Sequence, residues 1–140
     1  MVYNPPYCNA TTFIFALLWY DGANNTSLNS ASWRIHGLWP ETCIECLNCG
    51  YPSYCRKVHF NDSAIDRLRE KIKERWFPGK DLLVHEWNKH GSCDGKVTEF
   101  EYFNKTLNLW DCIPFRQECP NGGQECRLLL QSSQVDHCKA

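Results

Sequence analysis

The segment HEWNKHGSC, residues 85–93, places two imidazoles, a carboxylate and an ammonium group close together in the chain. On a helix, His85 and Lys89 would lie one turn apart, as would Glu86 and His90, so all four would share one sector of its surface. Lysine and protonated histidine offset the charge of a dianionic phosphorane, and histidine also moves protons. The segment therefore predicts an acid–base site that acts on a phosphate.

Two other interpretations of this segment are a polar surface helix with chance histidines and a zinc site. The first fits poorly because Trp87 and Cys93 are interleaved with the polar residues. The second requires histidines at i and i+4, whereas His85 and His90 stand at i and i+5, about 140° apart on an ideal helix. We therefore expect no metal and no cofactor.

A third histidine lies in RIHGLWPE, residues 34–41. His36 precedes Gly37, which allows close approach of another chain segment, and Trp39 offers a ring on which a nucleobase can stack. Taken alone, this motif would be read as a hydrogen-bonded core histidine beside a core tryptophan. Beside the segment at 85–93, it predicts a second half of the same site.

The ten cysteines among 140 residues indicate an oxidising compartment and a disulfide framework. Cys43, Cys46 and Cys49 could bind a metal, but in an oxidised protein such thiols are more often in disulfides, whose pairing cannot be read from the sequence. Five N-x-[ST] sequons agree with secretion, at Asn9, Asn24, Asn25, Asn61 and Asn104. We expect a secreted protein or one of the endomembrane lumen, such as a lysosome or vacuole, whose leader has been removed.

Length and charge suit a single domain over residues 1–140, which we expect to be monomeric. The net charge is −1, so no global basic field indicates a nucleic-acid binder. The locally basic stretch 56–80 fits a solvated helix face. The apolar run 13–20 is far too short to span a bilayer, and no membrane span is expected.

Residue patterns predict strands over 12–20, 32–36 and 126–131, with the second ended by Gly37 and Pro40. They predict helices over 63–77, 83–90 and 98–110, the first with a Ser63–Asp66 capping box. Loops are expected over 21–30 and over the cysteine-rich stretch 41–55. The fold class that accommodates these elements is α+β, with a mostly antiparallel central sheet, packed helices and disulfide staples.

HGLWP followed by HEWNKHGSC resembles the paired active-site signatures of the ribonuclease T2 family, which includes fungal acid ribonucleases and plant self-incompatibility ribonucleases. YPSYC at 51–55 and YFNKTLNLW at 102–110 are similar to family segments in the same order. The resemblance covers residues 12–110 well and 120–140 loosely. It implies an endoribonuclease that cleaves single-stranded RNA, but not DNA, through the 2′-hydroxyl and leaves 2′,3′-cyclic phosphates.

The resemblance also implies roles for single residues of the catalytic segment. His36 and His90 would be the acid–base pair, with His90 as base toward the 2′-hydroxyl and His36 as acid toward the leaving 5′-oxygen. His85 would hold the phosphate, while Glu86 and Lys89 would stabilise the pentacovalent state.

A base site and two disulfides follow from the same resemblance. Trp39 and Tyr51 would stack the base, and Glu41, where the family often has Asp, would accept from its edge. Cys55 would pair with Cys93, and Cys126 and Cys138 have a spacing similar to that of the family's closing disulfide.

The chain departs from the family where fuller members build a second base site. Leu18-Trp19-Tyr20 replaces Gln-Trp-Pro, and Leu82 and Leu83 replace the usual aromatics. A stretch of helix and sheet between Trp110 and Cys126 is also missing. The main alternative is a non-catalytic or dual-role secreted effector on this scaffold. A disulfide-rich binding module would explain the cysteines but not the two motifs.

Overall fold

The computed structural model describes residues 5–20, 32–120 and 123–138. A three-stranded sheet runs through it, with strands β1 (Ala10–Tyr20), β2 (Ser32–Cys43) and β3 (Glu125–Gln131). The strand order is β2-β1-β3, and β1 is antiparallel to both neighbours. The predicted α+β class with an antiparallel sheet is therefore confirmed. The loop expected over 21–30 lies outside the described residues.

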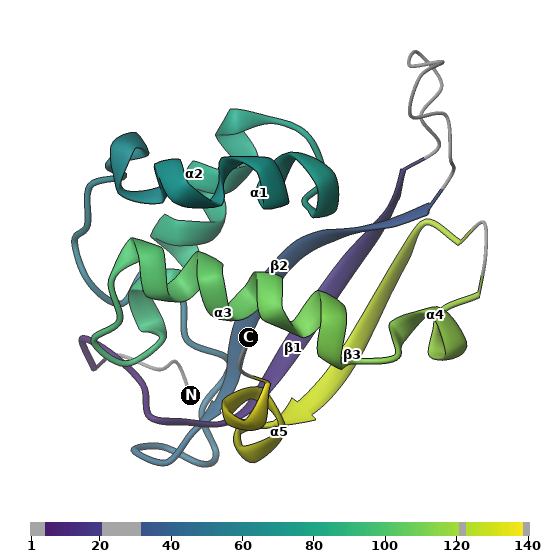
Figure 1. The fold of residues 1–140 in the computed structure, drawn as a ribbon. Helices are drawn as coiled ribbons and strands as arrows, with labels where there is room; N and C mark the ends of the chain where they lie inside the picture. Colours follow the sequence, from purple (N-terminus) through teal and green to yellow (C-terminus); the bar gives the residue numbers. More distant parts are fainter. Residues whose placement is uncertain (1–4, 21–31, 121–122, 139–140) are drawn as a thin grey trace.

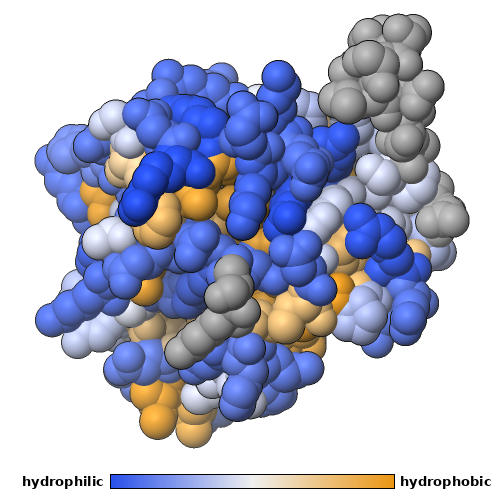
Figure 2. Space-filling model, in the orientation of Figure 1, coloured by the Kyte–Doolittle hydropathy of each residue, from blue (hydrophilic) through white to orange (hydrophobic). Residues whose placement is uncertain are grey.

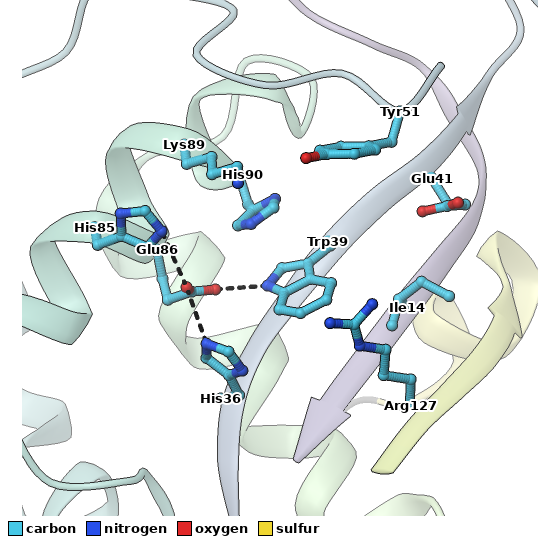
Figure 3. Close-up of a pocket in the computed structure, with 10 residues that line it drawn as sticks. All are labelled: Ile14, His36, Trp39, Glu41, Tyr51, His85, Glu86, Lys89, His90 and Arg127. Atoms are coloured by element: carbon cyan, nitrogen blue, oxygen red, sulfur yellow. Dashed lines mark hydrogen bonds and ion pairs between the residues drawn. The ribbon is translucent and has the colours of Figure 1, made fainter. Parts of the chain in front are cut away.

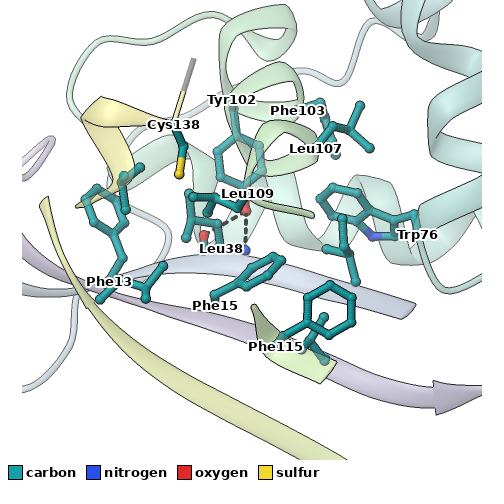
Figure 4. Packing of buried hydrophobic residues seen from close by; sticks show 14 of the residues in the cluster. Phe13, Phe15, Leu38, Trp76, Tyr102, Phe103, Leu107, Leu109, Phe115 and Cys138 are labelled. Carbon is teal, nitrogen blue, oxygen red and sulfur yellow. Dashed lines mark hydrogen bonds between the residues drawn. The ribbon is translucent and has the colours of Figure 1, made fainter. Parts of the chain in front are cut away.

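Helix α3 (Glu99–Cys112) lies across one face of this sheet (Figure 1). It begins with a capping box between Thr98 and Glu101. Buried aromatic and aliphatic side chains fill the space between α3 and the strands, Phe15 and Leu38 among them (Figure 4). The buried Tyr102 hydroxyl donates to the backbone oxygen of Leu38 at 2.8 Å, which fixes α3 to β2. This hydrogen bond therefore holds β2 against the helix.

The helix expected over 63–77 is two shorter pieces. A 3₁₀ helix η1 (Asp62–Leu68), which has non-helical backbone at Ile65, is followed by α1 (Arg69–Arg75). The cap is Asn61, whose side chain accepts from the Ser63 N–H, so the Ser63–Asp66 capping box was wrong. The Ser63 N–H is a free backbone donor at the start of the helix, and Asn61 satisfies it, which a cap at Ser63 itself could not do.

Helix α2 (Lys80–Lys89) carries the first part of the segment 85–93, and the short 3₁₀ turn η2 (Gly91–Cys93) follows it. Two further short helices, α4 (Phe115–Glu118) and α5 (Ser132–His137), flank β3 in the sequence and have no counterpart in the sequence prediction. In the part of the chain that the structure describes, no helix is long and apolar enough to cross a membrane.

Strand β2 extends to Cys43, well beyond the predicted end at His36, because a β-bulge carries it past Gly37. Ala16 of β1 pairs with Gly37 and Leu17 with Ile35, so His36 is an extra residue on β2. A bulge of this kind reverses the alternation of side chains along the strand. Ile35 before it and Leu38 after it both enter the core, which leaves the intervening residues free to face the other side.

All ten cysteines are in disulfides, which confirms the predicted framework. Cys55 pairs with Cys93 as expected, and the cysteines of the 43–49 run also form bridges, Cys8–Cys43 and Cys46–Cys49.

The pairing of Cys126 with Cys138 was wrong. Cys126 pairs with Cys119, and Cys138 pairs with Cys112 at the end of α3. Most of β3 separates Cys126 from Cys138, and an extended strand rises about 3.4 Å per residue. Their Cα atoms therefore cannot approach to the roughly 7 Å that a disulfide allows. Helix α5 instead turns the chain back toward α3.

The surface is mainly hydrophilic on the face that Figure 2 shows, with apolar side chains exposed in small patches. The exposed large apolar residues among those described are few: Ile44, Leu47, Tyr51, Tyr54 and Leu129. Tyr51 is half exposed and belongs to the functional pocket.

Candidate active site

A pocket of about 350 Å³ opens between α2, the middle of β2 and the adjoining loop. All eight side chains that the sequence singles out for catalysis or base binding line it (Figure 3). Those residues are His36, Trp39, Glu41, Tyr51, His85, Glu86, Lys89 and His90. Ile14 of β1 and Arg127 of β3 complete the lining. The two motifs, residues 34–41 and 85–93, thus meet in one place, although 44 positions separate Glu41 from His85 in the chain.

Glu86 lies at the centre of the pocket and is fully buried. Its Oε1 accepts a 2.6 Å hydrogen bond from Trp39 Nε1. Its Oε2 has no hydrogen-bond partner and lies 3.7 Å from His36 Nε2 and 4.0 Å from His85 Nε2. One carboxyl group thus lies between the indole of Trp39 and the imidazoles of His36 and His85 (Figure 3).

Gly37 makes this approach possible. A Cβ atom at this position would lie 1.9 Å from Glu86 Oε1 and 2.6 Å from Trp39 Nε1. No side chain fits there, so glycine is required for the helix carboxylate to reach the strand tryptophan. The bulge at the same place turns His36 to the face that also carries Trp39.

His90 caps the C-terminus of α2 and is buried against the pocket's aromatic residues. Its ring stacks on Trp39 with centroids 4.9 Å apart and an interplanar angle of 20°. The Tyr51 ring lies farther away, 6.4 Å from His90, and the Lys89 Nζ lies 5.6 Å from the centre of the Tyr51 ring. His90 therefore lies between the two rings expected to hold a base, and Trp39 and Tyr51 are not brought face to face.

Burial and neighbouring charge set the protonation of these groups. Burial, with Lys89, His85 and His36 adding to it, lowers the pKa of His90 to about 3. Burial, then the charge of Arg127, also lowers the pKa of His36. Burial raises the pKa of Glu86 to about 7, although the Trp39 hydrogen bond and Lys89 oppose the shift. At mildly acidic pH the pocket therefore holds a neutral His90 and a neutral Glu86.

Arg127 is the charged pocket residue that sequence reasoning missed. It lies opposite Ala16 in the pairing of β3 with β1, and its guanidinium is 5.0 Å from the centre of the Trp39 ring. The strand over 126–131 was predicted, but its partner and register depend on contacts more than 100 residues away in sequence. No local pattern in the sequence could have assigned Arg127 to the pocket.

Among the described residues, the one cluster of possible metal ligands is Cys8, Cys43 and Glu45. Both sulfur atoms of that cluster are joined in a disulfide and so are not available as thiolates. It lies outside the pocket lining.

The structure is an α+β domain whose pocket brings three imidazoles, Lys89 and a buried carboxyl group together beside aromatic rings. The sequence profile of the Ribonuclease T2 family matches residues 2–119, and the chain belongs to this family. Sequence relatives include "Ribonuclease T2-like" of Aspergillus fumigatus, 34% identical over 66% of this chain and 28% of the relative. Ribonuclease DdI of Dictyostelium discoideum is 35% identical over 56% of this chain and 37% of the relative. The chain therefore spans less than two fifths of the length of these relatives.

Solved structures show the same fold. A variant of RNase MC1 in complex with 5′-UMP superposes with a TM-score of 0.58 at 19% identity, covering 84% of this chain and 67% of that one. RNase NT in complex with 5′-AMP gives a TM-score of 0.55 at 24% identity, covering 82% of this chain and 66% of that one.

Proposed function

We propose that this chain is an endoribonuclease that cleaves single-stranded RNA by attack of the 2′-hydroxyl on the adjacent phosphate. The observation that supports this most strongly is the convergence of three imidazoles, Lys89 and a buried carboxyl group in one pocket, in a member of the Ribonuclease T2 family. Since the attack is intramolecular, positioning supplies much of the rate. The side chains need only move two protons and stabilise charge.

His90 acts as the base. Its low pKa keeps the imidazole neutral at all but strongly acidic pH, so it can take the proton of the 2′-hydroxyl as O2′ bonds to phosphorus. His36 acts as the acid, giving its proton to the 5′-oxygen as the P–O5′ bond breaks. The products are a 2′,3′-cyclic phosphate and a free 5′-hydroxyl, and the two histidines exchange protonation states.

The remaining groups stabilise the negative charge of the pentacovalent phosphorus. His85 and Lys89 line the pocket, His85 to hold the phosphate and Lys89 to offset the charge on its oxygens. Neutral Glu86 supplies a hydrogen-bond donor, because Oε1 accepts from Trp39 and leaves the unpartnered Oε2 to carry the proton. No step in this scheme requires a metal ion.

Five disulfides support function in an oxidising compartment, either outside the cell or in the endomembrane lumen. The base stacks on Trp39 and is contacted at its edge by Glu41, while Tyr51, which the sequence also assigned to stacking, lies on the His90 side of the pocket beside Lys89. A purely binding role, as a secreted effector on this scaffold, is the second candidate, and it predicts that the protein does not cleave RNA.

Incubation of the protein with single-stranded RNA in excess EDTA tests the proposal. We expect cleavage with 2′,3′-cyclic ends by mass spectrometry, and a loss of about 10²–10⁴-fold in kcat for His36→Ala and for His90→Ala. His59→Ala, an exposed histidine outside the pocket, is the matched control and should retain full activity. Full activity in the two pocket variants, or activity restored only by added zinc, would refute the mechanism.

A further inference from the structure

Arg127 covers one face of the Trp39 ring in the free protein. Its guanidinium carbon lies 5.0 Å from the ring centroid, and the stacked His90 ring lies 4.9 Å away. In Figure 3 these two groups stand on opposite sides of the indole. A nucleobase that stacks on Trp39 must therefore replace one of them.

The two groups differ greatly in how easily they can move. His90 is 4% exposed and is held at the end of α2 by its backbone hydrogen bond to Glu86. The Arg127 side chain is 55% exposed, and its one carboxylate neighbour among the described residues is Glu125, equally exposed, at 3.6 Å. An exposed ion pair of this kind contributes little. The base should therefore enter on the Arg127 side of the indole.

Once displaced, the guanidinium remains at the edge of the stacked base, since its strand is fixed in the sheet beside β1. Glu41 is the extra residue of a second bulge in β2, between Pro40 and Thr42, and its side chain lines the same pocket as Trp39. Within the described residues, the Glu41 carboxylate has no hydrogen-bond or ion-pair partner and is available to a ligand. A bound nucleobase would thus meet the forked N–H donors of the Arg127 guanidinium and the free Glu41 carboxylate, which is an acceptor.

Guanine is the base whose edges match this pair. Its N7 and O6 are adjacent acceptors, the pattern that an arginine fork recognises, and its N1–H and N2–H are adjacent donors suited to a carboxylate. Adenine presents an amino group where guanine has O6. Cytosine presents an amino group in place of a second adjacent acceptor, and uracil lacks the paired donors. Because Arg127 lies over the Trp39 ring and Glu41 lines the same pocket, both groups would lie beside a base that stacks on Trp39.

We propose that Arg127 is a specificity-determining residue and that, together with Glu41, it makes guanosine the preferred nucleoside on the 5′ side of the cleaved bond. This inference rests on the proposed ribonuclease function. It concerns the choice among bases and leaves the acid–base chemistry unchanged.

The test measures kcat/KM on GpU, ApU, CpU and UpU for the wild type, Arg127→Ala and Arg127→Lys. The charge of Arg127 also lowers the pKa of His36, so substrates are compared as ratios within each variant, in which a changed protonation of His36 cancels. Arg116→Ala is the matched control, because that exposed arginine lies 4.9 Å from the Trp110 ring and outside the pocket.

We expect the wild type to favour GpU, and Arg127→Ala to reduce the GpU/ApU ratio by about tenfold or more, mainly through KM. Arg127→Lys should restore little of the ratio, since an ammonium group lacks the planar fork, and Arg116→Ala should leave it unchanged. An equal fall on all four substrates, or a wild type without preference for guanosine, would overturn the inference while the ribonuclease function stands.

If the wild type cleaves none of the four, the proposed function fails instead. Calorimetric titration with 3′-GMP and 3′-AMP, which carry the phosphate on the same side as the nucleoside 5′ of the cleaved bond, then decides on Arg127 separately. Tighter binding of 3′-GMP that Arg127→Ala abolishes would support the inference, and equal binding of the two nucleotides would refute it.

Discussion

At the scale of residues, Glu86 connects the two functions of the pocket. The same carboxyl group orients the Trp39 indole through Oε1 and faces His36 and His85 through Oε2. Because burial raises the pKa of Glu86 to about 7, the group is neutral under the acidic conditions in which His36 is protonated. The hydrogen bond thereby holds the residue proposed to stack the base and the residue proposed to stabilise charge in a fixed relation.

The pH dependence of kcat/KM follows from the two histidines. The proposed mechanism requires neutral His90 and protonated His36 in the free protein. As pH falls, His90 becomes charged only near its pKa of about 3; as pH rises, His36 loses its proton below its ordinary pKa of 6.5. A bell-shaped profile with its maximum between about pH 3 and 6.5 is expected from initial rates on a dinucleotide. A rate that climbs steadily through pH 8 would rule out this assignment of acid and base.

At the scale of elements, the bulge in β2 is what makes the site. Strict alternation along the strand would place His36 and Trp39 on opposite faces of the sheet. The extra residue at His36 restores them to one face, and Gly37 leaves room for Glu86 beneath them. These residues were predicted from the sequence, but the strand was expected to end at His36, because glycine and proline are local signals of strand ends whereas a bulge depends on pairing with β1.

Gly37→Ala tests this account of the bulge. The added methyl group would displace the Glu86 carboxylate and the Trp39 ring, so we expect a loss of about 1–3 kcal/mol in the free energy of unfolding and a large loss of kcat/KM. Denaturant unfolding and initial rates measure the two effects. Gly123→Ala is a suitable comparison, since its Cβ would come no closer than 3.2 Å to Trp33, outside the pocket. Wild-type activity in Gly37→Ala would show that the close approach is not needed.

The Cys55–Cys93 bridge joins the base-site loop to the end of the catalytic helix and spans 38 residues. Replacing both cysteines with serine should cost about 4 kcal/mol in the free energy of unfolding and should raise KM, because Tyr51 is no longer held beside Lys89. The Cys112–Cys138 bridge spans 26 residues, and neither of its cysteines lines the pocket. Its removal should cost a similar amount, about 3–4 kcal/mol, and leave KM unchanged. Equal effects on KM from both pairs would contradict a positioning role for Cys55–Cys93.

At the scale of the whole molecule, the features that could be predicted from the sequence are those that depend on residues close together in the chain. The eight expected pocket residues lie in two short motifs and an adjoining loop, so motif spacing alone could find them. Arg127, the pairing of Cys138 with Cys112, and helix α5 all depend on how β3 docks against β1 and on where the chain turns afterwards. Those are long-range contacts, which residue periodicity and capping signals do not encode.

The central claim is that the 2′-hydroxyl of the substrate is the nucleophile. The most direct test is a DNA oligonucleotide that contains a single guanosine ribonucleotide, incubated with the protein in EDTA at pH 4.5 and analysed by mass spectrometry. We predict one cut, immediately 3′ of the ribonucleotide, with a 2′,3′-cyclic phosphate on one fragment and a 5′-hydroxyl on the other, and no cut when that ribose carries a 2′-O-methyl group. Cleavage at deoxynucleotides, or undiminished cleavage of the methylated oligonucleotide, would contradict the mechanism.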